Sequence, residues 1–253
     1  MLRRIGCGLS DIGRRRMANE DAFFLDDALG LYAVADGMGG HNAGEVASQE
    51  AIDTIHGMVV RGAAVIRALE ADGPSPEDLR KAQRLLESAV QAATYMVFGI
   101  AQHEPDQQGM GTTLSALLIA GSVGVTAQVG DSRVYLVRDG QASQLTEDHT
   151  LIGWQLKQGI ISAEEALHSP HKNVITRAVG SREYVQVDVH CFPVRSGDTF
   201  LLCSDGLHGY LRDADEIPPI TDLGPTVAAR RFIDLANERG GKDNITALVI
   251  EIT

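Results

Sequence analysis

The spacing of apolar residues divides the first hundred positions into short strands followed by two long helices. Residues 4–10 and 22–35 are short and apolar-rich, and residues 31–35 predict a buried strand that ends at Asp36. From residue 42 onward, apolar side chains recur every three or four positions, which predicts helices with one apolar face. The apolar stripe of the first helix is Ala47, Ala51, Ile55, Met58, Val65 and Leu69, and that of the second is Leu79, Ala82, Leu86, Ala89, Ala93, Met96 and Ile100.

Both helices carry start signals. Asn42, with Glu45 three residues later, has a capping-box arrangement. Ser75 is placed as the N-cap of the second helix, with Pro76 at its first position and Asp78 at its third. Gly-Pro at residues 73–74 separates the helices, so we expect an antiparallel pair that packs on a core.

The second half of the chain is rich in strands. Strands are predicted at 113–119, 123–129, 133–138, 141–145, 185–190, 199–203 and 244–252, and a helix at 227–239. Asp-Gly at 139–140 favours a tight hairpin, and an antiparallel meander is the simplest arrangement of residues 112–146. Residues 147–172 are helical but polar, with Pro170 as a breaker, which indicates a surface flap. Clustered strands and clustered helices favour an α+β fold over alternating βαβ units.

Composition limits the class of protein. With 253 residues, 44% of them apolar, the chain is long enough for one large domain spanning 1–253. Its net charge of −12 argues against general nucleic-acid binding. Three cysteines without a CxxC pair argue against a disulfide framework or structural zinc and favour a reducing compartment. Since neither a signal-peptide pattern nor a run of ~20 apolar residues is present, we expect a cytoplasmic protein without membrane contact.

The most informative residues are aspartates that border apolar segments. They are Asp21, Asp36, Asp131, Asp205 and Asp243, most of them with a glycine nearby. A carboxylate flanked by core residues is costly to bury unless a cation or partner compensates it. Several that converge would form an oxygen cage suited to Mg²⁺ or Mn²⁺. Ordinary Asp-Gly turn chemistry explains any single one of them, but it explains the whole ordered set poorly.

Seven short motifs occur in a specific order. They are Arg-Met-Ala-Asn-Glu-Asp at 16–21, Asp-Gly-Met-Gly-Gly-His at 36–41, Gly-Thr-Thr at 111–113, Gly-Asp-Ser-Arg at 130–133, Leu-Thr-Glu-Asp-His at 145–149, Ser-Asp-Gly-Leu at 204–207 and Asp-Asn-Ile-Thr at 243–246. Together they resemble the type 2C (PPM) serine/threonine protein phosphatases in their bacterial form, over residues 5–252. The resemblance implies a four-layer αββα sandwich, with two antiparallel sheets flanked by helices.

The resemblance also implies a catalytic set. Asp36 would bridge two divalent cations, Asp205 and Asp243 would complete the protein ligands of the first, and the Gly37 carbonyl would bind the second. Two Mn²⁺ or Mg²⁺ ions about 3.5–4 Å apart lower the pKa of a bridging water and stabilise in-line displacement at phosphorus, so no protein nucleophile is needed. The expected substrates are phosphorylated proteins, with a Ser/Thr kinase or its targets as the expected partner, and a monomer is the default.

Four further residues have implied roles. Glu20 and Asp21 would hold metal-bound waters. Arg16 would bind the substrate phosphate, because a guanidinium can hold two phosphoryl oxygens; without the motif, it would simply belong to a solvated run of arginines at 14–16. Asp131, together with Asp205, would bind a third, weaker cation, or would only cap its turn.

Two positions depart from the pattern. Met38 occupies the position where some members carry a histidine proposed as general acid, and methionine cannot donate a proton. His41, nearby, is better explained as part of the helix start. The flap reads His-Ser-Pro-His-Lys-Asn at 168–173, where many bacterial relatives place histidine directly before proline, and this changes expectations about substrate selectivity rather than catalysis.

Three rival functions are weaker. A cysteine-dependent phosphatase needs arginine six positions after its cysteine, and glycine occupies that position after all three cysteines. A non-catalytic module on the same fold is disfavoured because all the expected aspartates are present. A hydrolase of another phosphoester, such as a nucleotide, is mildly disfavoured by the acidic composition and the lack of a base-binding motif.

Overall fold

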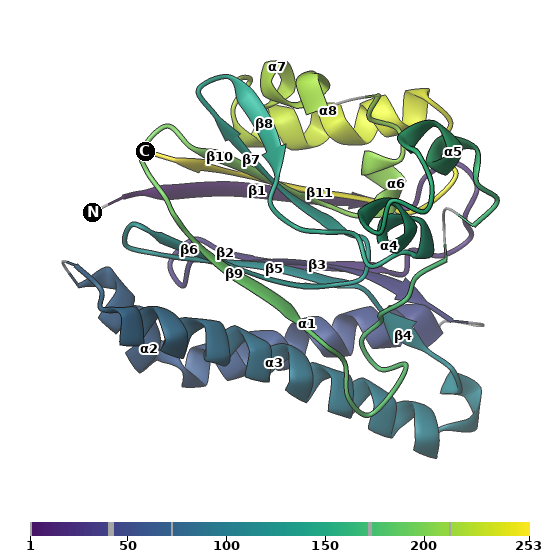
Figure 1. Cartoon of the computed structure of the whole chain (residues 1–253), viewed down its shortest axis with the longest axis horizontal. Coiled ribbons are helices and arrows are strands. Elements are labelled where there is room, and N and C mark those ends of the chain that lie inside the picture. The colour runs from purple at the N-terminus through teal and green to yellow at the C-terminus, as the bar shows by residue number, and fades with distance from the viewer. Residues whose placement is uncertain (1, 40–42, 72, 172–173, 213) are drawn as a thin grey trace.

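A computed structural model describes residues 2–39, 43–71, 73–171, 174–212 and 214–253, with residues 163, 167 and 168 described by their backbone alone. Four layers are stacked (Figure 1), with helices outside two antiparallel sheets. The first sheet has the strand order β1 (Arg4–Asp11), β11 (Ile245–Ile252), β10 (Thr199–Cys203), β7 (Arg133–Arg138) and β8 (Gln141–Gln144). The second has the order β2 (Asp21–Asp26), β3 (Leu31–Met38), β5 (Leu114–Ala120), β6 (Val123–Val129) and β9 (Asp188–Pro193), and β4 (Gly111–Thr112) pairs with the end of β3.

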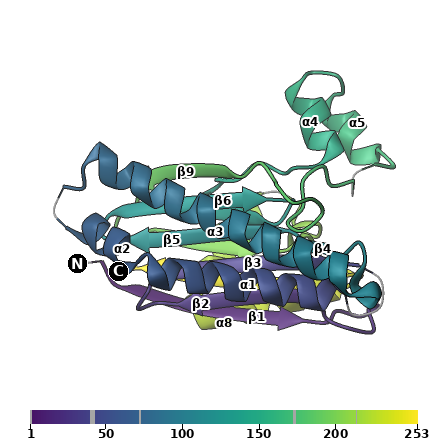
Figure 2. The same cartoon turned by 90° about the horizontal axis from the view of Figure 1, so that it is seen from below.

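The outer layers differ in size. Against the second sheet pack α1 (Ala43–Arg61), α2 (Ala63–Glu70) and α3 (Pro76–His103), followed by a short 3₁₀ turn at Pro105–Gln107. Against the first sheet pack α7 (Ile217–Thr221) and α8 (Pro225–Glu238), with α6 (Asp205–His208) and a 3₁₀ turn at Ala214–Glu216 nearby. Two short helices, α4 (Leu151–Lys157) and α5 (Ala163–His168), stand off one side of the sandwich (Figure 2).

Three apolar cores hold the layers together. One lies between the sheets and contains Tyr32, Phe200 and Leu248. A second joins the second sheet to α1 and α3, and the third joins the first sheet to α8. Strand β5 is buried along its whole length because its alternate side chains lie in the cores on its two faces. No helix among the described residues is long and apolar enough to cross a membrane.

Helix boundaries agree with the pattern in part. The capping box at Ser75 and Asp78 is present at the start of α3. The first predicted helix is instead two helices that divide at Gly62, where a Cβ atom would come within 2.5 Å of the Leu85 side chain, so glycine allows α2 to approach α3 closely. Met96 was wrongly placed in the core: it is 45% exposed, and Val97 on the next position is buried. The predicted cap at Asn42 and the placement of His41 lie outside the described residues.

Two of the predictions about the strands are wrong. The predicted meander is wrong, because β5 and β6 belong to the second sheet whereas β7 and β8 belong to the first. The chain crosses between the sheets at residues 130–132. The predicted hairpin at Asp139-Gly140 is confirmed, with positive φ at both residues (54° and 75°). The strand expected to end at Asp36 continues through Gly37 to Met38, because these two residues pair with β4.

One further strand differs from its predicted bounds, and two short helices were not predicted. The strand expected at 185–190 is found as β9, at Asp188–Pro193. The short helices α6 and α7 were not predicted, since each is too brief to show a period.

Candidate active site

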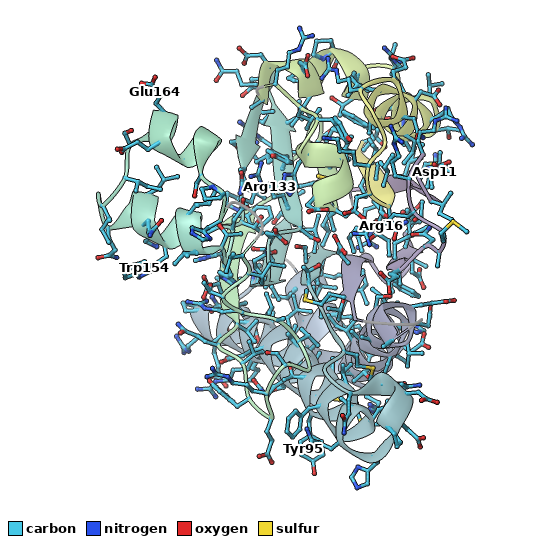
Figure 3. The ribbon with its side chains drawn as sticks, turned by 90° about the vertical axis from the view of Figure 1, so that its right-hand side faces the viewer. Asp11, Arg16, Tyr95, Arg133, Trp154 and Glu164 are labelled. Carbon is cyan, nitrogen blue, oxygen red and sulfur yellow. The ribbon has the colours of Figure 1, made fainter. Side chains whose placement is uncertain are left out.

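Five aspartates from separate parts of the sequence meet at one end of the sandwich. Asp21 begins β2 and stands opposite Asp36 of β3 in the strand register. Asp131 lies in the crossover between the sheets, Asp205 is the first residue of α6, and Asp243 lies two residues before the start of β11. Figure 3 looks onto this end, with Arg16 and Arg133 near its centre. The fold therefore brings together the aspartates that the sequence singled out.

The carboxylates perturb one another strongly. Burial raises the pKa of Asp36 well above its usual range, and the negative charges of the other four aspartates raise it further. Burial also raises the pKa of Asp131 to about 7, with a further contribution from Asp205. The pKa of Asp205 is raised by burial and then by Asp243. Such a cluster of carboxylates has an excess of negative charge that a cation would neutralise.

Two carboxylate oxygens of the cluster have no hydrogen-bond partner among the residues that the structure describes. Asp21 Oδ2 accepts hydrogen bonds from Ser204 Oγ at 2.8 Å and from Thr246 Oγ1 at 2.6 Å. Its other oxygen, Oδ1, is buried without a hydrogen bond, and the same is true of Asp205 Oδ1. Burial raises the pKa of Asp21 to about 7, while its two hydroxyl partners oppose that rise. Buried oxygens without a donor are the groups that a hard divalent cation would satisfy.

The donor set fits cations that keep water ligands. Among the described residues, no three side chains of Asp, Glu, His or Cys are gathered closely enough to hold an ion by themselves. Mg²⁺ usually keeps several waters and binds through one or two carboxylates, which is compatible with this arrangement. The residues present therefore fit divalent cations that share their ligands with water.

Arg16 is already engaged by the cluster. Its Nη2 donates to Asp243 Oδ2 and its Nε to Asp243 Oδ1, both at 2.8 Å, and Glu20 lies 4.0 Å from Nη1. The hydrogen bond with Asp243 raises the pKa of Arg16. Because the Arg16 side chain is 47% exposed, this forked donor stands at the solvent edge of the site, where it can also reach an anion from solution.

The backbone around Asp36 and Gly37 is tightly packed. The Gly37 N–H donates to the Glu20 carbonyl at 3.1 Å. A Cβ atom on Gly37 would lie 2.1 Å from the Gly44 carbonyl oxygen, so only glycine fits there. Met38, the next residue, is half-buried. The strand thus presents the Asp36 carboxylate and the Gly37 backbone next to the segment that carries Glu20.

Sequence reasoning missed the residues whose hydrogen bonds hold the segments around the aspartate cluster in place. Asn244 accepts the Glu20 N–H at 2.8 Å and donates to the carbonyls of Ile12 and Ala18 at 3.0 and 2.9 Å, which fixes the loop bearing Arg16. His208 Nε2 lies 2.9 Å from the carbonyl oxygen of Asp131. The only signal for Asn244 was its place inside the motif at 243–246.

The segment predicted as a flap lies beside this site. A cleft of about 560 Å³ separates α4 from the body of the molecule, and Trp154, Lys157, Arg177 and Asp188 are among its lining residues. Trp154 and Ile160 are more than half exposed. Figure 3 shows Trp154 and Glu164 on this lobe, away from Arg16.

Comparison with known proteins gives the family. The family model for protein phosphatase 2C matches residues 8–238. The chain belongs to the protein phosphatase 2C family. The serine/threonine phosphatase Stp of Listeria innocua is 39% identical over 247 residues, which cover 96% of this chain and 93% of Stp. PstP of Mycobacterium tuberculosis is also 39% identical, over 248 residues that cover 96% of this chain and 44% of PstP.

Solved structures agree. The crystal structure of the PstP catalytic domain in complex with two manganese ions aligns with a TM-score of 0.84 and 35% identity, covering 100% of both chains. A crystal structure of PstP/Ppp from Mycobacterium tuberculosis aligns with a TM-score of 0.83 and 36% identity, covering 98% of both chains. The predicted αββα sandwich and the predicted enzyme class are confirmed. The protein is a metal-dependent serine/threonine protein phosphatase. The roles of single residues stay predictions.

Proposed function

We propose that this phosphatase hydrolyses phosphoserine and phosphothreonine in proteins at the aspartate cluster, with two Mn²⁺ or Mg²⁺ ions bound there. The observation that supports this most is a pair of buried carboxylate oxygens, on Asp21 and Asp205, that have no hydrogen-bond partner in the described part of the chain. They belong to a cluster that also contains Asp36 and Asp243. When bound, two such ions would supply charge neutralisation and a water of lowered pKa for attack on phosphorus. The manganese pair in the PstP structure supports the same assignment.

The chain's own residues would divide the remaining work. Asp36, Gly37, Asp205 and Asp243 would hold the ions, while Glu20 and Asp21 would orient water around them. The hydroxyls of Ser204 and Thr246 fix Asp21 so that one carboxylate oxygen remains available. Asp131, with Asp205, would hold a third, weaker cation, which is supported by its raised pKa and its burial.

Arg16 would bind the phosphoryl group of the substrate. Its fork already accommodates two oxygens of a carboxylate at hydrogen-bonding distance. A phosphoryl group presents two oxygens in a similar geometry. The bound phosphate would compete with Asp243 for the guanidinium, so Arg16 would exchange one anion for another when substrate enters.

The cellular role is proposed from the family. We place the phosphatase in the cytoplasm as a monomer that opposes a bacterial Ser/Thr kinase, either on the kinase or on its targets. Residues 1–253 would act as one catalytic domain, with 147–172 as a flap that influences which phosphoproteins are accepted. The cleft beside α4 and the exposed side chain of Trp154 support a contact with substrate there.

The decisive test is Asp205→Asn, measured with a phosphothreonine peptide and Mn²⁺. Turnover should be abolished while circular dichroism shows an intact fold, and EDTA should remove the activity of the unaltered protein. The exposed Asp234 on α8 gives a control, because Asp234→Asn removes the same charge from a residue outside the aspartate cluster. Near-normal rates in Asp205→Asn would refute the two-metal assignment. Faster turnover of nucleotides than of phosphopeptides would instead favour another phosphoester as substrate.

A further inference from the structure

A buried set of hydrogen bonds holds the backbone of Asp36 from both sides. The Asp36 N–H donates to Thr113 Oγ1 at 2.9 Å, and the Asp36 carbonyl accepts from the Thr113 N–H and from Thr112 Oγ1, each at 2.9 Å. Both threonines are fully buried. Two consecutive residues therefore hold the backbone that carries the Asp36 carboxylate.

The same threonine reaches the crossover between the sheets. Thr113 Oγ1 lies 2.8 Å from Ser132 Oγ. Because Thr113 accepts the Asp36 N–H, its own hydroxyl proton is available to donate to Ser132. A Cβ atom on Gly130 would meet the Thr113 Cβ at 2.6 Å, and Gly130 has a φ of +100°. Thr113 thus packs against the turn that presents Asp131.

Gln128 completes this network beneath the turn. Its Nε2 donates to the carbonyls of Gly130 and Ser132 at 3.0 and 2.7 Å. Ser115 Oγ lies 2.8 Å from the Ser132 carbonyl oxygen and also contacts the Gln128 amide oxygen. The two neighbours of Asp131 are therefore both anchored to side chains of the second sheet.

The placement of this network distinguishes it from ordinary core filling. The core between the sheets contains a large apolar cluster, and buried hydroxyls and amides cost free energy unless they are hydrogen-bonded. Here the polar side chains Thr113, Ser115, Gln128 and Ser132 are nearly fully buried and hydrogen-bonded. The network ends at two carboxylate-bearing segments, one at Asp36 and the other at Asp131.

We propose that Thr113 and Ser132 are positioning residues, which set the Asp36 carboxylate relative to Asp131 across the junction of the two sheets. Partners that orient metal ligands typically change metal affinity or activity by about 10- to 100-fold when they are removed. This inference rests on the proposed function, because it assigns cation ligation to Asp36.

The test is the affinity for Mn²⁺, measured by titration calorimetry on the full chain. Thr113→Val should weaken Mn²⁺ binding by roughly 10-fold or more, and Thr113→Ser, which keeps the hydroxyl, should restore it. Thr126 provides a matched control, because it is a buried threonine of the same sheet whose Oγ1 has no hydrogen-bond partner among the described residues. Thr126→Val should therefore bind Mn²⁺ like the unaltered protein.

The outcomes separate the inference from the function beneath it. If Thr113→Val has a lower melting temperature but an unchanged Mn²⁺ affinity, Thr113 is merely structural and the inference is wrong. If Thr113→Val does not fold, Ser132→Ala decides in the same assay, with a loss of affinity supporting the inference and an unchanged affinity overturning it. Failure of the proposed function would show separately, as Mn²⁺ binding and turnover retained in Asp205→Asn.

Discussion

Replacing Asp131 with asparagine should make the metal-free phosphatase more stable at neutral and alkaline pH. Burial raises the pKa of Asp131 from 3.8 to about 7, and each pKa unit corresponds to about 1.4 kcal/mol. Ionising this carboxyl group in the folded chain therefore costs up to about 4 kcal/mol. The folded protein keeps the proton of Asp131 at pH values where the unfolded chain has already lost it, near pH 4. The free energy of unfolding therefore falls as the pH rises from about 4 through 7.

Two buried histidines change the free energy of unfolding in the opposite direction at lower pH. Burial lowers the pKa of His208 to about 3, and burial also lowers the pKa of His149. Each disfavours the folded state when the unfolded chain takes up a proton, below about pH 6.5. Between pH 6.5 and 8 part of this histidine contribution remains, but it is the same in the unaltered protein and in Asp131→Asn, so the difference between the two proteins isolates Asp131. Over this range the ionisation of Asp131 alone removes about 1 kcal/mol of the free energy of unfolding.

The measurement is thermal unfolding of EDTA-treated protein at pH 6.5, 7.2 and 8. About 1 kcal/mol corresponds to a shift of roughly 2–4 °C in a chain of this size. The melting temperature of the unaltered protein should therefore fall by at least that much more than the melting temperature of Asp131→Asn. Asp234→Asn serves as the control and should follow the unaltered protein. Parallel curves for the unaltered protein and Asp131→Asn would refute the electrostatic account of this cluster.

Three further predictions concern single contacts. Arg16→Lys keeps the charge but loses the two-pronged guanidinium donor that binds Asp243. The kcat/KM for a phosphopeptide should therefore fall by about 10-fold or more, mainly through a higher KM. An unchanged KM would contradict phosphate binding by Arg16. Thr246→Val removes the 2.6 Å hydrogen bond to Asp21, and a hydrogen bond to a charged group contributes about 1.5–3 kcal/mol. The affinity for Mn²⁺, measured by calorimetry, should therefore drop by at least about 10-fold. Equal affinity would show that Asp21 plays no part in the site. Ser75→Ala removes the cap of α3 and should lower the free energy of unfolding by about 1 kcal/mol in urea titrations, and it should leave turnover at 25 °C unchanged because α3 begins far from the cluster.

The sequence predicted the parts of the structure that depend on local pattern. Strands β6, β7 and β10 were placed at their observed bounds, and the start of α3 follows from Ser75 and Pro76. The assignment of strands to sheets was not predictable in this way. Strands β6 and β7 are both largely buried, and nothing in their pattern shows that the chain changes sheets between them.

The candidate site followed from the ordered motifs more than from periodicity. Apolar segments bordered by aspartates indicated a cation site, and the resemblance supplied the phosphoester chemistry. The contacts that support the site join residues far apart in the chain, such as Arg16 with Asp243, which are 227 positions apart. No local pattern reveals such a pair, because it arises only when the sheets pack. Methionine at position 38 has no proton to donate, and the absence of a general acid at this position stays a prediction.

The crossover at residues 130–132 has one more consequence. Asp21 and Asp36 belong to strands of the second sheet, whereas Asp205 and Asp243 flank strands of the first. Neither sheet alone carries all of the proposed metal ligands, so a partly folded chain with one intact sheet should be unable to turn over substrate. Enzymatic activity in this molecule is therefore a direct reporter of correct docking between the sheets, and its recovery during refolding should follow the formation of the core between them.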